Sequence, residues 1–175
     1  KLFGNAKMIA YEIKERIKRE LGITVSIGVS FNKIFAKLGS DLRKPDAVTV
    51  ITKENFKNIV WPLAVKELLY VGSSTEKKLI SRGIRTIGAL AQMNSADMQR
   101  ILGKWGEILW IFANGLDTSP VVPPLFDENI KGIGNSITTP RDLVNYEDAE
   151  YIIYILSQSI AQRLRQQSFK CRTVQ

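Results

Sequence analysis

Valine and isoleucine occupy every second position along residues 24–30, with small or polar residues between them. This two-residue period predicts a half-buried strand. Beyond it the apolar positions change to a helical spacing, which predicts a short helix that begins with Ser30 or Asn32 as its cap and ends at Leu42. The apolar stripe of this helix consists of Ile34, Phe35 and Leu38.

Two further helices and a second strand complete the N-terminal pattern. Residues 6–20 and 53–61 have helical periods, and residues 48–51 form a short apolar run of the strand type. Helices that cover one face of a small sheet indicate an α+β fold. The residues of the first helix expected to face the core are Ile9, Ile13 and Ile17.

From Pro62 to residue 118 only helical patterns occur. Residues 65–90 predict two short helices, a glycine-containing turn, a further helix and a second turn, and residues 95–117 predict another helical pair. Trp105 and Trp110 have apolar neighbours, so we interpret both as core residues rather than as platforms for stacked bases.

A proline-rich stretch over residues 118–124 has no helical period and predicts an extended tether. Beyond it we expect a strand over residues 129–140, an amphipathic helix over residues 147–166, and the beginning of a second strand at Arg172. The apolar face of that helix consists of Ile153, Leu156, Ile160 and Leu164.

The chain is strongly basic. Twenty-five lysines and arginines against 17 acidic residues give a net charge of +8 and a pI near 9.6, which favours a polyanionic partner. A basic protein without such a partner stays open as an alternative. An anionic membrane could use the same charge, but no long apolar span supports one, so we expect no membrane partner.

Cysteine and histidine chemistry is nearly excluded by composition. Cys171 is the only cysteine and there is no histidine, which rules out Cys/His zinc sites, an internal disulfide and a histidine-based triad. The chain opens at Lys1 without a methionine or a signal-peptide pattern. We therefore expect a piece of a larger intracellular protein, located in the cytoplasm.

Three lysines gather around the short helix after the first strand. Lys33 and Lys37 are four residues apart on the same edge, and Lys44 follows on a turn that Pro45 stiffens. A solvated helix face would explain this spacing as well as an anion site would.

The full string around these lysines, S-x-N-K-x-x-A-K-x-x-S-D-x-x-K-P, closely resembles the palm-domain signature of the Y-family translesion DNA polymerases, the DinB/UmuC type. In that family the lysine before the proline contacts the triphosphate of the incoming nucleotide, which implies this role for Lys44. A compact ammonium suits the task, because it neutralises phosphate as a point charge.

The resemblance runs along nearly the whole chain and implies an internal fragment with four parts. They are the C-terminal part of a palm, a helical thumb with a helix-hairpin-helix, a proline-rich tether and the N-terminal part of an α/β little finger. Their expected bounds are residues 1–61, 62–118, 119–128 and 129–175.

The glycine turn of the expected thumb resembles a helix-hairpin-helix, which directs backbone N–H groups at one DNA phosphate. An ordinary helical turn is the alternative. Tyr70 departs from the family pattern, since it stands where the first glycine is usual and could block close backbone approach. The candidate DNA-binding residues here are Gly72, Ser73, Ser74, Lys77 and Lys78.

The expected little finger carries the remaining candidate DNA contacts. The family often places arginine after the strand glycine, and Asn135 stands there instead, which weakens that contact. The residues positioned for phosphate contacts are Lys131, Ser136, Thr138 and Arg141.

The family's two-metal chemistry needs carboxylates that hold two Mg²⁺ ions. Neither its early Asp-rich strand nor its Ser-x-Asp-Glu hairpin occurs here, and we interpret Asp41 and Asp46 as structural. The resemblance therefore implies no catalytic or metal residue in this chain. The complete enzyme would use Mg²⁺, primer-template DNA and deoxynucleoside triphosphates, and segments outside this chain could bind a sliding clamp.

Two rivals from other classes remain open. A non-catalytic helix-hairpin-helix module of DNA repair would explain the charge and the hairpin but not the lysine string. A DNA glycosylase shares the hairpin, yet the catalytic Lys or Asp that follows it in glycosylases is not evident in TEKKLISRG.

Overall fold

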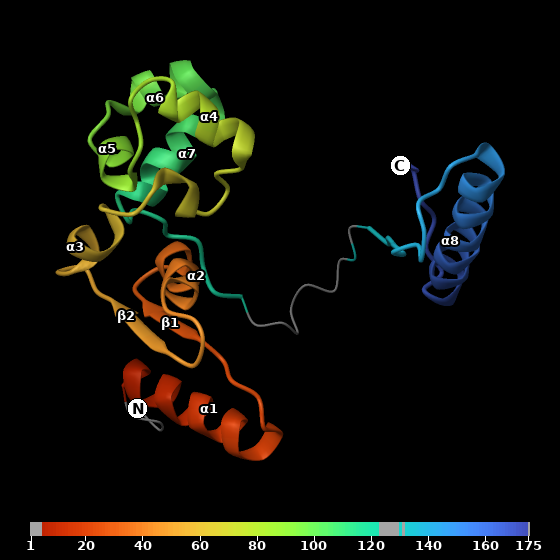
Figure 1. Ribbon diagram of the computed structural model, residues 1–175, viewed down its shortest axis with the longest axis horizontal. Coiled ribbons are helices and arrows are strands. Elements are labelled where there is room, and N and C mark those ends of the chain that lie inside the picture. Colours follow the sequence, from red (N-terminus) through yellow and green to blue (C-terminus); the bar gives the residue numbers. More distant parts are fainter. Residues whose placement is uncertain (1–4, 123–129, 131, 175) are drawn as a thin grey trace. The chain divides into compact units, whose positions relative to one another are not determined.

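The computed structural model describes residues 5–122, 130 and 132–174, and the chain divides into two compact units at Val121 (Figure 1). The first unit spans residues 1–121 and contains every helix and strand before the tether. The second spans residues 122–175 and contains one long helix. Each unit is described by itself.

A two-stranded parallel sheet forms the centre of the N-terminal part. Strands β1 (Ile27–Ser30) and β2 (Val48–Ile51) pair with Ile27 opposite Val48. Helices α1 (Ala6–Leu21), α2 (Lys33–Leu42) and α3 (Phe56–Val60) accompany them. The predicted strands and helices are confirmed, although β1 is shorter than the expected segment.

Helix α2 begins at Asn32, whose Oδ1 accepts a hydrogen bond from the N–H of Phe35 at 2.8 Å. Of the two caps expected from the sequence, Asn32 is therefore the one used. The predicted stripe is buried, with Phe35 fully enclosed. The helix lies so close to β1 that a Cβ on Gly28 would stand 1.8 Å from the carbonyl oxygen of Ala36.

Helix α1 presents a different face to the sheet from the one expected. Ile13 is 45% exposed, whereas Ala10 and Lys14 are buried, so the prediction was wrong for Ile13. The cause is an ion pair, because the ammonium of Lys14 lies 2.9 Å from Oδ1 of Asp46, just before β2. Apolar spacing alone does not reveal a charged residue turned inward.

The rest of the first unit is helical. A 3-10 turn η1 (Val65–Glu67) precedes α4 (Ser73–Ile80), α5 (Ile87–Ala91), α6 (Ser95–Leu102) and α7 (Lys104–Ala113). Two short helices were expected before the glycine turn, and the structure has the single 3-10 turn η1 there. The N–H of Val65 donates to the carbonyl of Arg85 at 2.9 Å. Because this hydrogen bond joins residues 20 positions apart in the same chain, it holds the segment out of a helix.

One hydrophobic core joins the sheet layer to these helices. It runs from Phe35 on α2 through Leu79 and Met98 to Ala113 at the end of α7. The indole N–H of Trp61 also donates to the carbonyl of Ala113 at 3.2 Å. The first unit is therefore packed as one body, and α2 lies directly against the segment that leaves α7.

The second unit consists of α8 (Tyr146–Gln166) and two extended segments beside it. Neither expected strand forms among its described residues, since the backbones of the two segments do not pair. A strand needs a hydrogen-bonded neighbour. Here side-chain hydrogen bonds attach the first segment to α8: Asn135 donates to Ser159 Oγ, and Arg163 donates to the carbonyl of Gly134.

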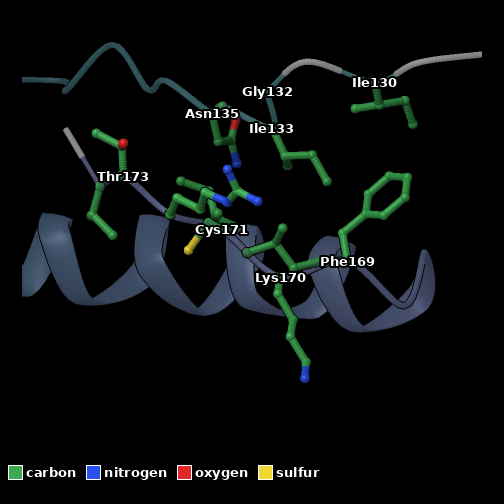
Figure 2. Close-up of a pocket in the computed structure, with 13 residues that line it drawn as sticks. Ile130, Gly132, Ile133, Asn135, Phe169, Lys170, Cys171 and Thr173 are labelled. Carbon is green, nitrogen blue, oxygen red and sulfur yellow. The ribbon is translucent and has the colours of Figure 1, made fainter.

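A hollow of about 830 Å³ lies between those segments and α8 (Figure 2). Ile160 and Leu164 line this hollow and are half-buried, as is Leu156. Ile153 is 65% exposed, so the expected apolar face was wrong at that residue. No described residue of the second unit is buried. The described part of this unit therefore has no core of its own.

Candidate nucleic-acid interface

Lys44 and Lys37 meet at one carboxylate on the surface of the sheet layer. The ammonium of Lys44 lies 2.7 Å from Oδ1 of Asp41, and Lys37 contacts its Oδ2. Both lysine side chains are more than half exposed. Hydrogen bonds from Lys37 and then Lys44 hold the pKa of Asp41 below its usual value. The result is a positively charged cluster whose remaining N–H donors face solvent.

Lys33 lies four residues before Lys37 on α2 and is exposed like it, but its ammonium does not bind the Asp41 carboxylate. As the first residue of α2, it donates to the carbonyl of Pro120 at 2.8 Å. Asn32 likewise donates from Nδ2 to the carbonyl of Gly115 at 3.2 Å. The start of α2 thus holds the backbone that leaves α7, a contact that the sequence pattern did not indicate.

Asp46 serves the packing of α1. Its two oxygens bind Lys14 at 2.9 Å and Lys18 at 2.6 Å. The hydrogen bond from Lys18, followed by that from Lys14, lowers the pKa of Asp46. Both aspartates near the basic helix therefore form ion pairs with lysines.

The glycine turn before α4 presents unpaired backbone donors. Gly72 caps the helix with extended backbone and no side-chain cap, and it is exposed together with Ser73 and Ser74. The N–H groups of these three residues donate to no acceptor among the described residues. Lys77 and Lys78 are exposed on the same helix, and neither forms an ion pair with a described residue. An anion at this turn would meet amide donors and the helix dipole, and the two lysines add positive charge on the last turn of the same helix.

Tyr70, which stands where the hairpin pattern has glycine, has a positive φ of +71°, in the region that favours glycine. Its ring centroid lies 5.7 Å from that of Trp105 and 6.0 Å from that of Phe112, both on α7. Trp105 is 55% exposed, so its assignment to the core was wrong, whereas Trp110 is half-buried and donates its indole N–H to the carbonyl of Met93. The one signal in the sequence for the exposed rings of Tyr70 and Trp105 was the tyrosine at a position where the hairpin pattern has glycine.

The candidate contacts of the second unit are only partly available. Ser136 and Thr138 are exposed on the first extended segment. Arg141 binds Oδ1 of Asp148 at 2.9 Å, which ties it to the first turn of α8. Lys131 lies outside the described residues.

Within the described parts of the chain, no group of three or more His, Cys, Asp or Glu side chains lies close enough to hold a metal ion. In the same residues, no helix combines the length and apolar character that a bilayer crossing requires.

Three family models match successive parts of this chain. Residues 1–41 match the impB/mucB/samB family, and residues 130–175 match the C-terminal domain of that family. Between them, residues 66–117 match the thumb domain of DNA polymerase iota. The hairpin and the exposed aromatic pair both lie within the thumb match.

Curated relatives align along nearly all of the chain. It is 60% identical over 174 residues to DNA polymerase IV of Acetivibrio thermocellus and 40% identical over 173 residues to DNA polymerase IV of Alkaliphilus oremlandii. Each alignment covers 99% of this chain, and 44% and 43% of the respective relative. The chain therefore spans less than half the length of these relatives.

Solved structures agree with the sequence matches. DinB from Sulfolobus solfataricus superposes with a TM-score of 0.60 at 30% identity, covering 68% of this chain and 35% of its own. A Y-family DNA polymerase chimera gives a TM-score of 0.61 at 30% identity, over 69% of this chain and 35% of its own.

Proposed function

Because the chain belongs to the Y-family of DNA polymerases, we propose that it forms the palm, thumb and little-finger part of a translesion polymerase. The complete enzyme would extend a primer across damaged template DNA in the cytoplasm. We assign residues 1–61 to the palm, 62–118 to the thumb, 119–128 to the tether and 129–175 to the little finger.

The part of this function that the chain itself carries is the binding of duplex DNA by its backbone. The observation that carries the proposal is the N-terminus of α4, where Gly72, Ser73 and Ser74 present unpaired amide donors. Lys77 and Lys78 add positive charge on the last turn of the same helix. Contacts of this kind position DNA without reading its sequence. Ser136, Thr138 and Arg141 would add contacts from the little finger, and the proposed Lys131 contact rests on the sequence alone.

The Lys44 cluster supports a second role, binding of the incoming nucleotide. Lys44 would neutralise the triphosphate, while Asp41 fixes its ammonium beside that of Lys37. The complete enzyme would also need carboxylates for two Mg²⁺ ions, which supply the nucleotidyl-transfer chemistry. The described residues do not fit such a site, so we assign no chemical step to them. We leave a sliding clamp as a partner of segments outside this chain.

A non-catalytic helix-hairpin-helix module would use the same hairpin. That alternative gives no role to the ammonium pair at Asp41, which is why the polymerase assignment is preferred.

Replacing Ser73 with proline tests the hairpin directly, because it removes one N–H from the first residue of α4. Proline is tolerated at that helical position, and Gly72 with φ −84° and ψ 174° already has backbone that suits a following proline. We expect Ser73→Pro to weaken duplex binding about tenfold, the cost of one charge-assisted hydrogen bond. Fluorescence anisotropy of a labelled duplex measures this.

The matched control is Ser95→Pro, the same change at the first residue of α6, where Asn94 has φ −72° and ψ 134°. This variant should keep the wild-type affinity. The logarithm of that affinity should fall linearly with the logarithm of salt concentration. Equal affinities for both proline variants, or binding that does not depend on salt, would remove the hairpin from the interface.

A further inference from the structure

Two aromatic side chains form an exposed platform beside the thumb hairpin. Tyr70 is 61% exposed and Trp105 is 55% exposed, and their rings lie 5.7 Å apart with a tilt of 38°. Neither residue belongs to the hydrophobic core, whereas the neighbouring Phe112 and Trp110 pack against it. The core therefore does not account for the outer faces of these two rings.

The backbone at Tyr70 strengthens this observation. A φ of +71° is strained for a residue with an aromatic side chain and free of strain for glycine. The chain thus carries a tyrosine where glycine would be more stable, two residues before the unpaired amides of Gly72. Because its ring contributes little to the core, the side chain needs an explanation outside folding.

We propose that Tyr70 and Trp105 form a stacking site for an unpaired nucleobase of single-stranded DNA. Exposed aromatic faces accept any base by stacking. Lys104, exposed and without an ion-pair partner among the described residues, directly precedes Trp105 and suits a phosphate backbone. This proposal rests on the proposed function only in taking DNA as the ligand. The two sites differ in what they bind: the hairpin amides would hold a duplex phosphate, and the rings would hold a base outside the duplex.

The tryptophan emission of the 175-residue chain reports this site. Of its three tryptophans, Trp61 and Trp110 are half-buried and bind backbone carbonyls through their indole N–H, so Trp105 is the accessible one. An oligothymidylate of about 12 nucleotides, within the usual length of such sites, should quench this emission in a saturable way. Trp105→Phe should remove the quenching and identify its source.

The decisive variant is Tyr70→Gly, because glycine adopts the observed φ without strain and the fold is retained. We expect its affinity for oligothymidylate to fall at least about fivefold, the loss of one stacked base. Tyr70→Phe keeps the ring and should bind like the wild type. A melting curve for each variant checks that the chain is folded.

Three results would overturn the proposal: no quenching by oligothymidylate, wild-type affinity in folded Tyr70→Gly, or equal quenching by a blunt duplex. If the platform bound a protein instead of DNA, oligothymidylate would not quench the tryptophan emission. The proposed hairpin function fails separately, through equal duplex affinities of Ser73→Pro and Ser95→Pro.

Discussion

Replacing Lys44 with alanine is expected to lower kcat/KM for the incoming nucleotide about tenfold to a hundredfold, the cost of one charge-assisted contact to phosphate. The affinity for primer-template DNA should stay nearly unchanged, because the proposed contact is to the triphosphate. The measurement requires a complete polymerase. An exchange chimera provides one, with this chain in place of the matched 174 residues of the Acetivibrio thermocellus relative.

Single-turnover incorporation in this chimera separates nucleotide binding from DNA binding. Lys7→Ala is the matched control, since Lys7 is exposed on α1 and forms no ion pair with a described residue. Asp41→Asn adds a second readout, because Lys44 then loses the carboxylate 2.7 Å away that positions it. Unchanged nucleotide kinetics in Lys44→Ala would remove this lysine from the site.

Replacing Gly28 with alanine should destabilise the sheet layer by about 3 kcal/mol or more, the upper range for overpacking. The added Cβ would stand 1.8 Å from the carbonyl oxygen of Ala36 and 2.6 Å from the N–H nitrogen of Ser40. Both neighbours are backbone atoms of α2, so no side-chain rotation relieves the clash. Chemical denaturation followed by far-ultraviolet circular dichroism measures the loss.

Gly72→Ala is the control for this substitution in the same unit. A Cβ at Gly72 meets nothing within 4 Å, and its φ of −84° is open to any residue. The cost should be about 1 kcal/mol or less, the difference between glycine and alanine as a helix cap. Equal stabilities of the two variants would mean that α2 does not lie on β1 as described.

The sequence was sufficient where a feature depends on local chemistry. The strand that ends at Ser30 and the cap at Asn32 depend on adjacent residues, and both appear in the structure, although β1 is half-buried along its whole length instead of at alternate positions. The family string was also local, and the role it implies for Lys44 stays a prediction. The position of Lys33 was not predictable in this way, since its partner Pro120 is 87 residues away.

Other features depend on what lies across the chain. Ile13 faces outward because Lys14 reaches Asp46, a pairing that hydrophobic spacing cannot express. The segment around Asn135 has a strand pattern but no paired neighbour among the described residues, so its alternation forms no sheet. Tyr70 was recognised as a departure from the hairpin pattern, but only the structure gives its φ and the exposed ring beside it.

Primer extension by the exchange chimera tests the central claim most directly. With Mg²⁺ and deoxynucleoside triphosphates, the chimera should extend a primer on undamaged template and past an abasic site. The complete Acetivibrio thermocellus enzyme and this chain by itself are the two references. A folded chimera that binds primer-template DNA but extends no primer would contradict the assignment to a translesion polymerase and favour the non-catalytic module.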